Sequence, residues 1–127
     1  MSMLRPALAA DHRVQLRWET FAHDAIADIA AWLSLHPVPA IAFNDHTTDT
    51  LAAAAAGRMR KLDKWAQRAG MTVAEYVAAA EAIHANAPDV AAKTSGVASL
   101  ARSHGAILLA HDEAATEDRQ ANRCLGM

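Results

Sequence analysis

The stretch IAFNDHT, residues 41–47, decides how the rest of the chain is interpreted, because its apolar run stops abruptly at Asn, Asp and His. The run is short and follows the two prolines of HPVP, residues 36–39, so it predicts a buried strand rather than a helix. Its polar end has three interpretations: a turn, a helix cap, or the metal-binding end of a parallel strand.

Two more strands are predicted around this one. Residues 13–19 alternate apolar and polar side chains, and residues 106–110 (AILLA) form another apolar run. Helical spacing of apolar residues predicts helices over residues 23–35, 50–69, 72–87 and 88–104, and a last one from about Thr116 to just before Gly126. The helix over 50–69 is expected to be continuous, with Met59 and Leu62 on its apolar face. Thr72 and Glu75 match a capping box.

This order of strands and helices predicts the fold class. Strands that alternate with helices form a parallel sheet with right-handed crossovers, so we expect an α/β fold. In such sheets, functional residues gather at the carboxyl ends of the strands.

All three predicted strand ends carry residue types that bind metals. These residues are Glu19 after the first strand, Asp45 and His46 after the second, and His111, Asp112 and Glu113 after the third. Imidazole with carboxylate suits zinc, or manganese or iron where carboxylates dominate. A bound divalent metal would lower the pKa of its water and supply a hydroxide nucleophile. Polar residues at strand exits also serve as caps and turns, and spacing alone leaves both interpretations open.

The composition limits which partners and which compartment this chain suits. Lys and Arg number 12 and Asp and Glu 14, a net charge of -2 that argues against broad nucleic-acid binding. No apolar run approaches the ~20 residues of a membrane span, so we expect no membrane partner. The single cysteine, Cys124, allows no internal disulfide, which favours a reducing, cytoplasmic compartment. The RMRK run, residues 58–61, is expected to be a solvated helix face, with phosphate binding as the alternative.

Three segments, LRWE, FNDHT and LAHDEAAT, resemble in this order the metal-dependent amidohydrolase superfamily. They are similar to its phosphonate-metabolism branch, the ribose methylphosphonate triphosphate diphosphatases, which show DHTPGQ and SHDDxTPEH with a long helical insertion between them. The resemblance implies a (β/α)₈ barrel that hydrolyses a phosphoanhydride of a phosphorylated small molecule with metal-bound hydroxide. It implies metal binding by Glu19, His46 and His111, and substrate binding by Asp45, Asp112 and Glu113.

The chain departs from this family in its loops and in its length. HTTDT, residues 46–50, replaces the His-Thr-Pro-Gly pattern, and HDEAATED lacks the proline before the acidic residue. A whole barrel needs about 250 residues, whereas this chain has 127, and the family's first-strand His-x-His pair and last-strand aspartate have no counterpart. We therefore expect a partial barrel of about three βα units, residues 1–127 forming one partial domain. We expect it to have an incomplete metal site and to be inactive alone.

A three-stranded parallel sheet leaves two strand edges unpaired. For that reason we expect the chain to form a homo-oligomer. The alternative function is a non-catalytic α/β or helical module that only associates with itself.

Overall fold

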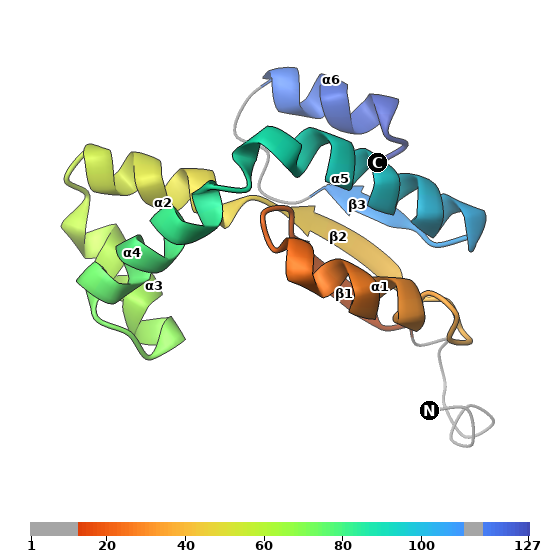
Figure 1. The fold of residues 1–127 in the computed structure, drawn as a ribbon, viewed down its shortest axis with the longest axis horizontal. Coiled ribbons are helices and arrows are strands. Elements are labelled where there is room, and N and C mark those ends of the chain that lie inside the picture. The colour runs from red at the N-terminus through yellow and green to blue at the C-terminus, as the bar shows by residue number, and fades with distance from the viewer. Residues whose placement is uncertain (1–12, 111–115) are drawn as a thin grey trace.

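The computed structural model of this chain describes residues 13–110 and 116–127 (Figure 1). Its elements in chain order are β1 (Gln15–Glu19), the 3₁₀ helix η2 (His23–Ala25), α1 (Ile26–Trp32), β2 (Ala40–Asn44), α2 (His46–Ala55), α3 (Met59–Ala69), α4 (Val73–His84), α5 (Ala87–Ser103), β3 (Leu108–Ala110) and α6 (Thr116–Cys124). No helix within the described residues is both long and apolar enough to cross a bilayer.

The three strands form one sheet in the order β1-β2-β3, and both strand pairs are parallel. In the register, Trp18 pairs with Phe43, and Phe43 pairs with Ala110. The predicted parallel α/β fold is therefore confirmed. The described residues form an open sheet, and the extra helices lie between the second and third strands as expected.

One face of the sheet is covered by helices and forms the main core. Alternate side chains of the strands point to this face, because successive residues of a strand point to opposite sides. The core contains Trp18, Ile41, Phe43 and Leu108 from the sheet, Ile29 from α1 and Leu33 just after it, and Val97, Ala98 and Ala101 from α5. Trp18 meets Phe43 edge to face, with ring centroids 5.6 Å apart, a favoured geometry for aromatic pairs. Ala98 and Ala101 of α5 are fully buried, and their small side chains let this part of the helix approach the sheet closely.

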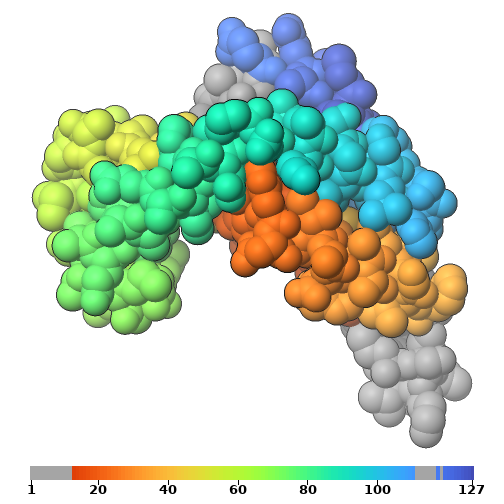
Figure 2. Space-filling model, in the orientation of Figure 1, coloured from red at the N-terminus to blue at the C-terminus, as the bar shows by residue number. Residues whose placement is uncertain are grey.

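Helices α2, α3 and α4 pack against one another in a second lobe beside the sheet (Figures 1 and 2). Its buried side chains are small or aliphatic, and they include Thr50 and Ala53 of α2, Leu62 and Ala66 of α3, and Ala80 of α4. In Figure 2 this lobe projects away from α1. The start of α2 connects it directly to the end of β2.

The predicted continuous helix over residues 50–69 is wrong. The chain forms α2 and α3 instead, with a corner at Gly57, whose φ of 63° lies in the left-handed region. Glycine adopts this conformation at no steric cost, so it ends the helix despite the helix-favouring alanines before it. The corner also changes the predicted apolar face: Leu62 is buried, but Met59 is 53% exposed.

Other helix ends follow the prediction more closely. Thr72 and Glu75 form the predicted capping box, in which Thr72 Oγ1 accepts from the Glu75 N–H and the Glu75 carboxylate accepts from the Thr72 N–H. Pro88 stands in the first turn of α5. The predicted helix over residues 23–35 begins as the 3₁₀ helix η2 and ends at Trp32.

Candidate functional site at the carboxyl edge of the sheet

The carboxyl ends of β1 and β2 lie side by side, as the parallel sheet requires. Glu19, the last residue of β1, is in register with Asn44, the last residue of β2. Helix α2 begins two residues later, at His46. The sheet therefore brings Glu19 and His46 together, although they lie 27 residues apart in the sequence.

Two contacts join Glu19 to His46. The His46 backbone N–H donates to Glu19 Oε2 at 2.9 Å, and His46 Nδ1 lies 2.5 Å from Glu19 Oε1. Both side chains are partly exposed, at 35% for Glu19 and 40% for His46. The carboxylate thus satisfies an unpaired N–H at the start of α2 and sits at the positive end of the helix dipole. Glu19 ties the end of β1 to the beginning of α2.

The same contact fixes the orientation of the imidazole. An ionised carboxylate only accepts hydrogen bonds, so His46 Nδ1 must carry the proton that it donates to Glu19. An uncharged imidazole that donates from Nδ1 has its lone pair at Nε2. A histidine whose other nitrogen donates to a carboxylate is the usual arrangement for a metal ligand, and also for a base that accepts a proton. Glu19 therefore holds the His46 ring in one orientation, and the metal-binding roles predicted for both residues remain predictions.

Asp45 has a structural role at this edge. It is the N-cap of α2, and its carboxylate accepts from the Thr48 N–H at 2.9 Å. The helix-cap interpretation of the polar end of IAFNDHT is therefore confirmed for Asp45. Capping by one carboxylate oxygen is compatible with the substrate-binding role predicted for Asp45, which remains a prediction.

A cavity of about 680 Å³ lies beside the strand ends. Its lining includes Thr20, Phe43 and Asn44 from the sheet edge, Thr94 from α5 and Leu125 beyond α6. Asn44 Oδ1 and Thr94 Oγ1 are both buried and form no hydrogen bond in the structure as described. Buried polar atoms are normally paired, so these two oxygens are groups that a bound molecule would satisfy.

Sequence reasoning did not select these two residues. Asn44 belongs to the polar end of IAFNDHT, but it was not distinguished from a turn residue. Thr94 is a threonine within a helix, and nothing in the local sequence separates it from a solvated position. Only the fold shows that both oxygens are buried.

The third part of the predicted site lies outside the described residues. His111, Asp112 and Glu113 follow directly after β3, which ends at Ala110. Among the side chains that the structure describes, no three of His, Cys, Asp or Glu are grouped closely enough to hold a metal ion. The metal site predicted from His46, Glu19 and His111 is therefore not assembled by the described residues, and it remains a prediction.

Another histidine has a packing role. The His84 ring, at the end of α4, stacks on Phe21 with ring centroids 5.7 Å apart and 18° between their planes. Asn86 lies close by and donates from its side-chain amide to the Phe21 carbonyl at 2.8 Å. Together the two contacts join the end of α4 and the residues just after it to the loop after β1.

Comparison with protein-family models, with curated proteins and with solved structures gave no match for this chain.

Proposed function

We propose that this chain is part of a metal-dependent hydrolase of the amidohydrolase type, which acts on a phosphoanhydride bond of a small phosphorylated substrate and has no turnover by itself. The observation that supports this proposal best is the contact of Glu19 with His46 at the carboxyl edge of a parallel sheet. The reaction class comes from the motif resemblance. The structural support is the His46 imidazole, which Glu19 holds in one orientation.

The donor set fits part of a divalent metal site. His46 would bind the ion through Nε2, while Glu19 holds the Nδ1 proton and keeps the ring in one orientation. When bound, the ion would lower the pKa of its water and so supply a nucleophile. A zinc site needs three or more protein ligands. The proposal assigns the next ligand to His111 and the neighbouring acidic roles to Asp112 and Glu113.

Calorimetric titration of the full chain with Zn²⁺ or Mn²⁺ tests this function. We expect His46→Ala to abolish binding. We expect Glu19→Gln to weaken it by about 10–100-fold, because the imidazole loses its orienting carboxylate. His104→Ala is the matched control, since His104 is an exposed histidine at the C-terminal end of α5. No metal binding by the unaltered chain, or binding that survives His46→Ala, would contradict the proposal.

Self-association is the second candidate function, and a separate observation favours it. Within the described residues, β1 and β3 each have one unpaired edge. Apolar side chains near these strands are exposed: Val14 at 45%, Ile107 at 50% and Leu109 at 38%. Unpaired edges and exposed apolar surface promote pairing between chains.

Sedimentation velocity at micromolar concentration tests this second candidate. We expect the unaltered chain to sediment as an oligomer, and Leu109→Lys to shift it toward monomer because a charged side chain on an edge strand disfavours pairing. Lys93→Glu, on the exposed surface of α5, is the control and should change nothing. A monomeric unaltered chain would exclude this candidate.

A further inference from the structure

Positive charge is concentrated on one helix of the second lobe. The segment from Arg58 to Arg68 contains five of the 12 Lys and Arg residues and a single carboxylate, Asp63, whereas the whole chain has a net charge of -2. The function proposed above gives this segment no role.

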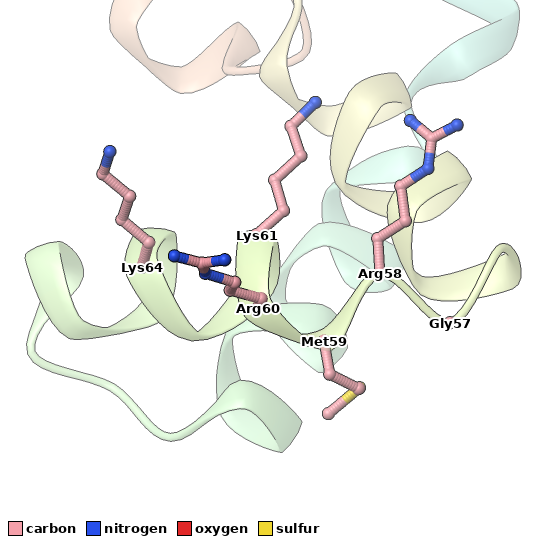
Figure 3. A pocket seen from close by; sticks show the side chains of 6 residues that line it. All are labelled: Gly57, Arg58, Met59, Arg60, Lys61 and Lys64. Carbon is pink, nitrogen blue, oxygen red and sulfur yellow. The ribbon is translucent and has the colours of Figure 1, made fainter.

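Four of these cations surround a groove at the corner between α2 and α3, which we call the corner groove (Figure 3). It has a volume of about 560 Å³ and is lined by Gly57, Arg58, Met59, Arg60, Lys61 and Lys64. In Figure 3 the side chains of Arg58, Lys61 and Lys64 extend to the same side of α3. These residues are three positions apart, so they place three cations along about 9 Å of the helix.

The cations of the corner groove are not neutralised from within the described residues. Arg58, Arg60 and Lys64 form no ion pair with a carboxylate of that part of the chain. The Lys61 ammonium lies 4.5 Å from the centroid of the Trp65 ring. That contact is a cation–π interaction, which orients the ammonium without adding a negative charge. Arg60 and Lys64, four residues apart on one helix, repel each other.

The start of α3 adds a further unfavourable term for these cations. Arg58 is the N-cap, its side chain caps no N–H, and the first turn contains no acidic residue. Cations at this end of a helix oppose the helix dipole, which favours anions there. A bound anion would offset both the repulsion between cations and their interaction with the dipole.

We propose that the corner groove binds a ligand with two or three linked phosphate groups, either free polyphosphate or the polyphosphate of a nucleotide. A row of cations suits a linear polyanion better than a single phosphate. Every residue that lines the groove is exposed, which suits a ligand whose oxygens stay largely hydrated. The groove lies at the opposite end of α2 from His46, about 15 Å away for a ten-residue helix, so it is independent of the candidate metal site.

Calorimetric titration of the full chain tests the proposal, with tripolyphosphate, ATP, orthophosphate and sulfate at matched ionic strength. We expect tripolyphosphate to bind more tightly than orthophosphate or sulfate. The triple variant Arg58→Gln, Lys61→Gln, Lys64→Gln should lose affinity by at least about tenfold, because three charged contacts to phosphate are removed. A control that removes exposed cations elsewhere, Lys93→Gln with Arg123→Gln, should keep its affinity for tripolyphosphate. The ratio of ATP to tripolyphosphate affinity distinguishes the two sources of the phosphates.

Three results would overturn the proposal. The first is equal affinity of the unaltered chain for tripolyphosphate and sulfate. The second is an equal loss of tripolyphosphate affinity in the triple variant and in the control variant with Lys93→Gln and Arg123→Gln. The third is a single-stranded oligonucleotide that binds the same residues more tightly than tripolyphosphate. Removing cations from the start of α3 relieves their conflict with the dipole, so the triple variant should unfold at the same temperature as the unaltered chain or higher. If the triple variant fails to fold, Arg58→Gln and Lys64→Gln alone must each weaken tripolyphosphate binding.

Discussion

Replacing Glu19 tests whether its carboxylate connects the sheet to α2. Glu19→Ala removes the acceptor of the His46 N–H, at 2.9 Å, and the partner of the His46 ring. A hydrogen bond to a charged group contributes about 1.5–3 kcal/mol when well shielded from water. Glu19 is 35% exposed, so the low end applies, and the interaction with the helix dipole is already part of that contact. We expect Glu19→Ala to lower the free energy of unfolding by about 1–2 kcal/mol.

Urea unfolding followed by far-ultraviolet circular dichroism measures this loss. Glu81→Ala, an exposed glutamate on α4, is the control and should change stability by less than about 0.5 kcal/mol. His46→Ala keeps the backbone N–H that donates to Glu19, so it should cost less than Glu19→Ala. The double variant should show a coupling of about 0.5 kcal/mol or more, as expected for residues in direct contact. Equal losses of unfolding free energy in Glu19→Ala and Glu81→Ala would refute the contact between Glu19 and His46. A coupling energy of zero between Glu19→Ala and His46→Ala would also refute it.

Three further changes probe the fold by the same urea measurement. Gly57→Ala should lower the free energy of unfolding by about 1–2 kcal/mol, because φ is 63° at this position. Gly96→Ala, in the open middle of α5, should raise it by roughly 0.5–1 kcal/mol. A change of the same sign at both positions would contradict the left-handed corner at Gly57. Thr72→Ala should cost about 1 kcal/mol through loss of the α4 cap. The hydrogen bonds from the Thr72 backbone and side chain hold the pKa of Glu75 below its ordinary value of 4.5. That contribution to stability is therefore present above pH 4.5 and is lost as the pH falls through the lower folded pKa. Thr72→Ala should reduce this pH dependence only in part, because the backbone N–H at position 72 still donates to Glu75. Leu33→Ala should lower the free energy of unfolding by about 2–5 kcal/mol, because Leu33 is fully buried in the core under the sheet. A loss below about 1 kcal/mol would contradict that packing.

The predictable parts of this fold depend on short-range chemistry. The capping box of Thr72 and Glu75 spans three residues, and its partners are adjacent in any helix that starts there. The apolar patterns of residues 13–19 and 40–43 predict strands, and the helical segments between the strands predict that they are parallel. The corner at Gly57 was missed since a single glycine after alanines is compatible both with a continuous helix and with a break. The tertiary packing of α3, which buries Leu62 and Ala66 in the lobe formed with α2 and α4, distinguishes the two.

The candidate site was predictable only in part, because its contacts are tertiary. The rule that parallel strands end at one edge brought Glu19 and His46 to the same place. It did not show whether the two side chains would face one site independently or would bond directly to each other. That distinction depends on which Glu19 oxygen meets which His46 nitrogen. The buried oxygens of Asn44 and Thr94 likewise depend on how α5 packs on the sheet edge.

Nitrogen NMR of the His46 imidazole, with and without Zn²⁺, tests the central claim most directly. The two ring nitrogens give separate signals, and the His46→Ala variant identifies them by their absence. We predict a neutral ring protonated at Nδ1, where it donates to Glu19, and a large shift of the Nε2 signal when Zn²⁺ is added. A ring protonated at Nε2, or an Nε2 signal that Zn²⁺ leaves unchanged, would contradict the assignment of His46 as a metal ligand oriented by Glu19.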